Sequence, residues 1–216
     1  PNSHAYGTRA YYQFADLRKY QGDITVEQMN RFISSTSSGR SGVFAGKGAA
    51  ILAAAKSADI NEMYLLSHMV TETGWGTSLM AQGKYFEAGT ATIKLNGLYF
   101  SKEAPAGRYY NFIGWGAYDG RPDTAYDFAR YYGWNSIENA LNGAAQQLAR
   151  NYIYSGQSTL YDMRWNPAYS DKYGGIGHQY ATDPNWARTI SSIMGQGYDY
   201  IGVKPRVEFL VPRYAS

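Results

Sequence analysis

The chain has 216 residues, of which 44% are hydrophobic and 17% are charged, so it can bury one substantial core and is not a disordered protein. Its net charge of +3 is too small for the dense basic surface of a nucleic-acid-binding protein, although it suits weak attraction to an anionic surface. The absence of cysteine from the sequence excludes disulfides, thiolate nucleophiles and zinc sites built from cysteine.

The first third of the chain predicts three helices. A T-x-x-Q capping box opens the first, over residues 25–34. Residues 34–42 are rich in serine and glycine and predict a flexible surface loop. The Ala-rich residues 43–58 predict a closely packed second helix. It should lie against the third, which begins after the capping residue Asn61.

The remainder of the chain predicts a β element followed by helices. Residues 85–110 alternate short apolar and polar residues with glycines, which predicts a small β-hairpin or irregular lobe beside a cleft. Three helices are predicted over residues 123–132, 136–153 and 183–194, and an Asp-Pro pair opens the last one. Residues 203–216 predict an extended strap on the surface.

No segment of the sequence predicts a membrane span or a secretion signal. The longest apolar stretch, residues 48–55, is far shorter than the roughly 20 residues that a bilayer requires, and a lysine flanks it on each side. The opening residues, PNSHAYGTRA, lack a basic segment followed by an apolar one. We therefore expect no signal peptide in this chain.

The motifs of several enzyme classes are missing from the sequence. It contains no H-E-x-x-H zinc motif, no phosphate-binding G-x-x-x-x-G-K-[ST] loop and no G-x-S-x-G serine-hydrolase motif. Its 3 histidines are scattered and make no ligand set. We therefore expect neither a metal ion nor a cofactor.

Residues 61–78, NEMYLLSHMVTETGWGTS, place a carboxylate where local rules disfavour it. Glu72 lies in the last turn of a mostly apolar helix, where the negative end of the helix dipole costs about 0.3 to 1 kcal/mol. That position, with partial burial beside Trp75, should raise the affinity of Glu72 for a proton. Glycoside hydrolysis needs such an acid, because the glycosidic oxygen leaves as it is protonated. Taken alone, a glutamate at this position is more often a solvated residue at a frayed helix end.

The stretch SHMVTETGWGTS resembles the catalytic helix of the bacterial endo-β-N-acetylglucosaminidases of glycoside hydrolase family 73, in which an S-H-x-x-x-E-T-G-x-G-T-S pattern carries the acid. Four further stretches resemble the glucosaminidase domains of Gram-positive autolysins, in the same order: residues 10–20, 109–119, 159–167 and 178–186. The resemblance implies hydrolysis of the β-1,4 bond after N-acetylglucosamine in peptidoglycan. It also implies a mainly α, lysozyme-like fold with two helical lobes around a cleft and a small β-hairpin or irregular lobe.

The resemblance also sets expectations for organisation and location. Residues 1–216 should form a single glucosaminidase catalytic domain of two lobes, taken from a larger wall-bound protein. Its expected partners are the glycan strands of bacterial peptidoglycan, not nucleic acid, and we expect a monomer. The expected location is the cell wall, after secretion.

A glycosidase normally needs a second group opposite the acid. Asp119 and Tyr118 in GWGAYDG are the preferred candidates, because glycines on both sides let the backbone approach a ligand and the stretch matches a family motif. Asp119 is equally consistent with a turn residue that bonds its own backbone. Glu103 is the alternative, since some relatives place a second catalytic Glu in such a hairpin. The 2-acetamido group of the substrate is a third option.

Several residues are expected to contact the sugar. Trp75 follows the acid and is expected to wall the adjacent subsite, with core packing as the alternative. His68 lies one turn before Glu72, within reach of a hydrogen bond, although a lone helical histidine is more often a packing residue. The resemblance adds five residues as sugar contacts or cleft residues: Asn111, Tyr154, Tyr180, His178 and Asp183. His178 could instead hold a loop, and helix capping alone would explain Asp183.

These observations predict an autolysin-type endo-β-N-acetylglucosaminidase with Glu72 as general acid. A muramidase or lytic transglycosylase, which attacks the other β-1,4 bond, is the alternative within the same fold. A non-catalytic wall-binding module is the alternative from a different class.

Overall fold

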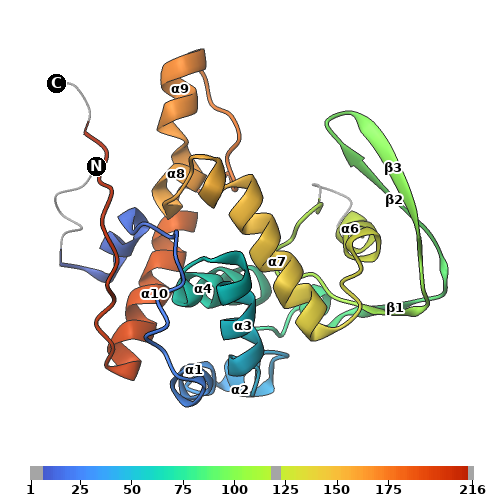
Figure 1. The fold of residues 1–216 in the computed structure, drawn as a ribbon, viewed down its shortest axis with the longest axis horizontal. Coiled ribbons are helices and arrows are strands. Elements are labelled where there is room, and N and C mark those ends of the chain that lie inside the picture. The colour runs from blue at the N-terminus through green and yellow to red at the C-terminus, as the bar shows by residue number, and fades with distance from the viewer. Residues whose placement is uncertain (1–6, 118–122, 214–216) are drawn as a thin grey trace.

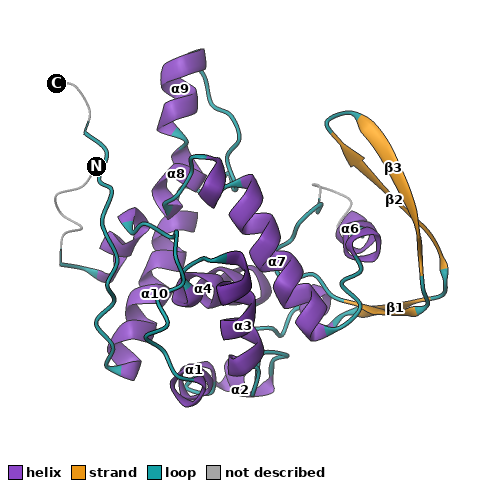
Figure 2. Cartoon of the chain, in the orientation of Figure 1, coloured by secondary structure: helices purple, strands orange, loops and turns teal. Residues whose placement is uncertain are grey.

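Residues 7–117 and 123–213 are described by the computed structural model, in which helices form the body and a long β-hairpin projects from one side (Figure 1). Figure 2 shows that strands occur only in that projection within the described part of the chain. The mainly α fold class predicted from the sequence is therefore confirmed.

The elements follow one another in this order. Before the strands come η2 (Arg9–Phe14), α1 (Val26–Ile33), α2 (Ser37–Ser41), α3 (Gly48–Ala58), α4 (Glu62–Thr73) and α5 (Leu79–Gln82). The strands are β1 (Lys84–Phe86), β2 (Gly89–Leu95), β3 (Leu98–Ala104) and β4 (Gly107–Tyr109). They are followed by α6 (Thr124–Tyr132), α7 (Ile137–Asn151), η3 (Ile153–Ser155), α8 (Leu160–Trp165), α9 (Pro167–Tyr173) and α10 (Trp186–Ile201).

Helix α4 lies at the centre of the molecule (Figure 1). Every residue from Glu62 to Val70 is buried, and α3 and α10 both pack against the helix. The Asn61 side chain accepts a hydrogen bond of 2.8 Å from the backbone N–H of Tyr64, so the predicted cap is confirmed. Helix α4 ends at Gly74, which has the left-handed backbone that commonly terminates helices. Packing on all sides therefore determines where the end of α4 points.

The predicted β-hairpin is confirmed and packs against α6. Strand β2 pairs with β3, and β1 with β4, both antiparallel. Ala91 and Ile93 on β2 are buried, on the side of the hairpin that contacts α6. Thr90 and its partner Glu103 belong to the opposite face, because successive residues of a strand alternate between faces. Both side chains are exposed there.

The predicted helices are confirmed, and two of them have bounds that differ by several residues. The capping box of Thr25 and Gln28 opens α1, and Ser136 caps α7. Helix α3 begins at Gly48 rather than at residue 43, because the backbone N–H of Val43 donates to Gly76 in a neighbouring turn. Helix α10 begins at Trp186 and continues to Ile201, beyond the predicted end at residue 194.

The prediction of a flexible loop over residues 34–42 is wrong. The short helix α2 occupies Ser37–Ser41, and the Thr36 hydroxyl caps it by accepting a hydrogen bond of 2.9 Å from the backbone N–H of Gly39. Hydroxyl side chains satisfy local backbone groups in a turn as readily as in a helix, so this serine-rich composition does not separate the two.

The C-terminal segment runs beside the N-terminal one. Residues 203–213 contain no helix, as predicted, and Phe209 forms an isolated β-bridge with Ala15. Among the described helices, none combines the length and the apolar character needed to cross a bilayer.

We expect Gly197→Ala to lower the free energy of unfolding. A Cβ atom at Gly197 on α10 would lie 2.4 Å from the Met63 sulfur on α4 and 2.8 Å from the Phe32 ring. Such overpacking costs about 1 to 3 kcal/mol. Chemical unfolding measures the change, and Gln196→Ala on the exposed side of the same helix is the matched control, expected within about 0.5 kcal/mol of wild type. A Gly197→Ala protein as stable as wild type would contradict this account of the α4–α10 contact.

Candidate active site

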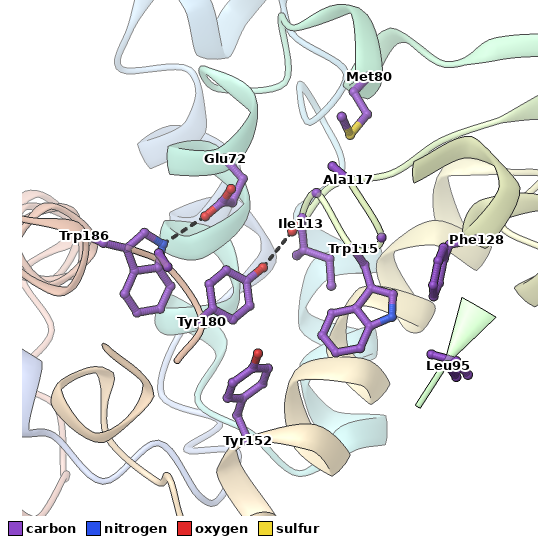
Figure 3. Close-up of a pocket in the computed structure, with 13 residues that line it drawn as sticks. Glu72, Met80, Leu95, Ile113, Trp115, Ala117, Phe128, Tyr152, Tyr180 and Trp186 are labelled. Atoms are coloured by element: carbon purple, nitrogen blue, oxygen red, sulfur yellow. Dashed lines mark hydrogen bonds between the residues drawn. The ribbon is translucent and has the colours of Figure 1, made fainter. Parts of the chain in front are cut away.

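A cavity of about 540 Å³ opens beside the C-terminal end of α4 (Figure 3). Its walls come from the end of α4, α5, the tip of the hairpin, residues 113–117, α6, the end of α7, residues 180–181 and the start of α10. Glu72 is the only carboxylate among its described lining residues. Elements from most of the chain therefore meet around one acidic side chain.

The Glu72 carboxyl is enclosed although its backbone lies at an exposed helix end. Its side chain keeps 24% of its surface exposed. One oxygen, Oε1, accepts a hydrogen bond of 2.9 Å from the indole Nε1–H of Trp186 (Figure 3). Burial raises the pKa of the Glu72 carboxyl, and the Trp186 N–H offsets part of that rise by stabilising the charged form. Glu72 therefore holds its proton to a higher pH than an exposed glutamate does.

His68 and Tyr64 lie behind Glu72 on the same helix. Both side chains are fully buried. The Tyr64 hydroxyl is 3.0 Å from His68 Nδ1, and His68 Nε2 is 3.7 Å from Glu72 Oε1. Burial lowers the pKa of His68 to about 3, so its ring is neutral near neutral pH. No full positive charge from His68 therefore opposes protonation of Glu72.

Four aromatic rings line the cavity, and we call them the aromatic wall: Trp115, Tyr152, Tyr180 and Trp186. Tyr180 stacks on Trp186 at 4.8 Å between ring centroids and lies 5.2 Å from Tyr152. The Tyr180 hydroxyl donates a hydrogen bond of 2.6 Å to the backbone oxygen of Ile113 (Figure 3). Tyr180 thus connects the segment before α10 to the loop on the other side of the cavity.

Asn111 holds that loop in place. Its amide nitrogen donates to the backbone oxygens of Trp115 at 2.9 Å and Ala125 at 3.0 Å. Its amide oxygen accepts from the backbone N–H groups of Ile113 at 3.3 Å and Trp115 at 3.2 Å. The residue is fully buried. Because these bonds use both donors and the oxygen, the structure places Asn111 in loop support rather than at the cavity surface.

Trp75 and Tyr154 lie away from the cavity. Gly74 ends α4 in a left-handed turn, and Trp75 itself has φ 62°, so the indole turns away from Glu72. It packs edge-on against Phe32 at 5.6 Å. The Tyr154 hydroxyl donates to the backbone oxygen of Asp59 at 2.6 Å, beside a separate charged groove. Neither side chain is among the described residues that line the cavity.

His178 and Asp183 support the segment that carries Tyr180. His178 Nδ1 lies 2.5 Å from the amide oxygen of the buried Gln157, and its ring is 4.8 Å from Tyr152. The Asp183 carboxylate accepts from the backbone N–H of Asn185 at 2.9 Å, just before α10 begins. Of the five residues that the resemblance added, only Tyr180 lines the cavity.

Of the three candidates for a second catalytic group, the structure describes only Glu103. Asp119 and Tyr118 lie outside the described residues, although Ala117, immediately before them, lines the cavity. Glu103 lies on the exposed face of the hairpin, close to the hydroxyl of Thr90, and is not part of the cavity wall. The structure therefore gives Glu103 no contact with Glu72.

The sequence reasoning missed Trp186, Trp115 and Tyr152 as site residues. Trp186 and Trp115 both lie inside stretches that carry the family resemblance, which was the available signal. Tyr152 ends the apolar stripe of α7 and therefore looked like a core residue. A buried carboxylic acid beside an aromatic wall can protonate a leaving group while the rings pack on the faces of a sugar.

Comparisons with known proteins agree with this geometry. A profile of the glucosaminidase family, described as mannosyl-glycoprotein endo-beta-N-acetylglucosaminidase, matches residues 48–199. The bifunctional autolysin of Staphylococcus aureus (strain Mu50 / ATCC 700699) is 36% identical over 204 residues, which make up 94% of this chain and 15% of that protein. The chain therefore spans only a small part of the length of this relative.

Two solved structures are similar along most of the chain. One is a catalytic mutant of S. aureus autolysin E in complex with the disaccharide NAG-NAM, with a TM-score of 0.67 and 27% identity over 91% of this chain and 78% of that one. The other is a major bifunctional autolysin, with a TM-score of 0.65 and 34% identity over 98% of this chain and 77% of that one.

We expect Glu72→Gln to stabilise the protein at neutral pH. Because the pKa of Glu72 is raised on folding, the unfolded chain releases this proton first as pH rises, and the free energy of unfolding falls above the ordinary carboxyl pKa. Glutamine does not titrate, so the advantage of the variant in melting temperature should grow from acid to neutral pH. Glu87→Gln, at an exposed glutamate, is the control. An advantage that does not change with pH would argue against a raised pKa.

Proposed function

The chain belongs to the glucosaminidase family, and on that premise we propose that it cleaves the β-1,4 bond between N-acetylglucosamine and N-acetylmuramic acid in peptidoglycan, as an endo-β-N-acetylglucosaminidase. Glu72 is the general acid. The observation that carries the proposal is the enclosed Glu72 carboxyl, the only carboxylate among the described residues of the cavity. Its lysozyme-like fold is that of the autolysin domains to which the chain is similar.

The reaction begins with transfer of the Glu72 proton to the glycosidic oxygen. The bond between that oxygen and the anomeric carbon breaks, positive charge develops on the sugar ring, and Glu72 is left as a carboxylate. The Trp186 N–H already points at Oε1 and stabilises that charge without rearrangement. The aromatic wall offers rings for packing against the sugars on either side of the bond.

We assign the second role to Asp119. The chain leaves the described region at Ala117 on the cavity wall, two residues before Asp119. Glu103, by contrast, is on the outer face of the hairpin. Tyr118 directly precedes Asp119 in the sequence and is the second candidate. The 2-acetamido group of the substrate is the option that needs no second carboxylate.

The chain acts, in this proposal, as one catalytic module of a longer protein that is secreted and works at the cell wall. Its extent supports this, since it matches 15% of the length of the staphylococcal bifunctional autolysin. Residues 1–216 form the single glucosaminidase domain, and peptidoglycan glycan strands are its partners.

We expect Glu72→Gln to reduce peptidoglycan solubilisation by about 10² to 10⁴-fold, because the leaving oxygen loses its proton donor. Turbidity loss of purified walls measures the rate, and Glu87→Gln should keep wild-type activity. Mass spectrometry of the products tests the bond: N-acetylglucosamine at the new reducing end supports the proposal. Anhydromuramyl or muramic acid ends would instead identify a lytic transglycosylase or a muramidase. Unchanged solubilisation by Glu72→Gln would point to a non-catalytic binding module.

We expect Asp119→Asn to lower kcat more than Glu103→Gln does. Asp119 follows Ala117 of the cavity wall by two residues in the sequence, whereas Glu103 is exposed on the hairpin. Initial rates on a soluble muropeptide oligomer measure both variants. The reverse order would transfer the second role to the hairpin, and wild-type rates for both would favour the 2-acetamido group of the substrate.

A further inference from the structure

The Nε2 atom of His68 is a buried polar atom next to the cavity. It has no hydrogen-bond partner among the described residues. A buried polar atom without a partner costs free energy, which an apolar side chain at this position would avoid. Glu72 Oε1 lies 3.7 Å from His68 Nε2, just beyond hydrogen-bond distance. Tyr64, His68 and Glu72 lie at intervals of four residues on α4 and therefore share one face of the helix.

We propose that His68 is a positioning residue: it directs an Nε2 proton at Oε1 of Glu72 and thereby keeps the acid proton of Glu72 on Oε2. The proposal rests on the assignment of Glu72 as general acid. It also identifies Oε2 as the oxygen that delivers the proton and His68 as the residue that keeps the proton there.

The hydrogen bonds around His68 favour a proton on Nε2. With that tautomer, the Tyr64 hydroxyl donates to Nδ1 at 3.0 Å and the Nε2–H points toward Glu72. With the other tautomer, Nδ1–H donates to the Tyr64 hydroxyl, which is left to donate to the weak acceptor Met163 Sδ at 3.5 Å. An unprotonated Nε2 would then face Oε1 and would have a donor only with the acid proton of Glu72 on Oε1 instead of Oε2.

The partners of the two carboxyl oxygens differ. Oε1 receives the indole N–H of Trp186 at 2.9 Å, and an indole nitrogen can only donate. With His68 Nε2–H on the same side, Oε1 is the acceptor and the acid proton belongs on Oε2. Oε2 lies beside Gly114 in the cavity wall. A Cβ atom added to Gly114 would be 3.7 Å from Oε2, so the space next to this oxygen is open. The proton is therefore held at the oxygen that a substrate in the cavity can reach.

No charged group other than Glu72 is among the described side chains that contact the His68 ring. Its neighbours are Tyr64 and Glu72 on its own helix, and Tyr180 and Trp186 from the segment before α10 and its start. Burial raises the pKa of both tyrosines well above the usual value, so their hydroxyls are neutral near neutral pH and Glu72 is the one carboxyl group among these neighbours. When Oε2 gives its proton to the glycosidic oxygen, the His68 and Trp186 N–H groups both donate to the new carboxylate. Such bonds are often long in the free enzyme and shorten in the complex.

The tautomer of His68 is measured directly in the free protein. A long-range ¹H–¹⁵N correlation spectrum distinguishes a protonated ring nitrogen from an unprotonated one. The chain has 3 histidines, so loss of one set of signals in His68→Gln assigns His68. We expect a protonated Nε2 that does not titrate between neutral pH and the acid limit of stability. A proton on Nδ1 would overturn the proposal.

The kinetic test uses His68→Leu with a soluble N-acetylglucosamine–N-acetylmuramic acid tetrasaccharide. Removing a donor to the charged form raises the pKa of Glu72 further, so the alkaline limb of the pH–rate profile should move to higher pH. We expect kcat to fall about 10-fold or more, with KM within about 2-fold of wild type, because the lost bond forms to a charged group. His68→Gln, which keeps an N–H donor, should recover most of kcat.

Tyr64→Phe and Tyr198→Phe form a matched pair of controls. Both hydroxyls are buried and bond to residues at α4, Tyr64 to His68 and Tyr198 to the capping residue Asn61. Tyr64→Phe frees the His68 tautomer and should shift the alkaline limb in the same direction as His68→Leu. Tyr198→Phe should lower stability and leave the limb unchanged. If Tyr64→Phe and Tyr198→Phe have the same pH–rate profile, His68 is a packing residue only. The same conclusion follows if His68→Leu lowers the rate without moving the alkaline limb.

A ¹³C titration of the Glu72 carboxyl in the free protein separates this proposal from the proposed function. The pKa of Glu72 should rise in His68→Leu whether or not the chain cleaves peptidoglycan. An unchanged pKa would overturn the role of His68 while leaving Glu72 as general acid. Activity retained by Glu72→Gln would instead remove the function on which the catalytic role of His68 depends.

Discussion

Burial of helix α4 is the constraint on which the site depends. A helix packed on all sides cannot rotate or slide without opening voids in a dense core, so the position of its last turn is determined by the body of the protein. Glu72 extends from that last turn into the cavity. Helix α10 packs along the same helix and brings Trp186 to Oε1. The acid and its hydrogen-bond donor are thus held by one helix pair.

The pKa of Glu72 is raised by burial away from water, and not by the repulsion of a neighbouring carboxylate. No second carboxylate is among the described residues of the cavity, and His68 is neutral because its ring is buried. Burial likewise raises the pKa of Tyr152 to about 12, so the aromatic wall carries no charge near neutral pH. Apart from the Trp186 N–H group, the described surroundings of Glu72 in the cavity are therefore uncharged rings and apolar side chains. Such an arrangement favours a functional group at the expense of folding stability.

Hydrogen bonds from distant segments close the cavity around the acid. Tyr180 bonds to Ile113, and Asn111 bonds to both ends of the following turn. Gly116 in that turn has φ 80°, and a Cβ atom there would lie 2.1 Å from the Phe128 ring on α6. The loop can take this path only with glycine at that position. The loop and α6 therefore pack closely against each other at the cavity wall.

The sequence by itself determined the elements whose signals are local. The cap at Asn61, the apolar run that follows it and the Gly74 stop define helix α4, and they place Glu72 in its last turn. The alternation around residues 85–110 likewise predicted the hairpin, because side chains of a strand face opposite sides in turn. Capping and periodicity depend on a few neighbouring residues, so they can be recognised in the sequence without knowledge of the fold.

Only the tertiary structure decided which side chains surround the acid. Adjacency in sequence favoured Trp75 as the neighbour of Glu72, but the left-handed turn after α4 directs that indole toward Phe32. The indole that does contact Glu72 belongs to Trp186, 114 residues further along the chain. Asn111 and Tyr154, expected at the sugar, instead bond to backbone oxygens elsewhere. Contacts between distant segments depend on how whole helices pack, and no local pattern encodes that packing.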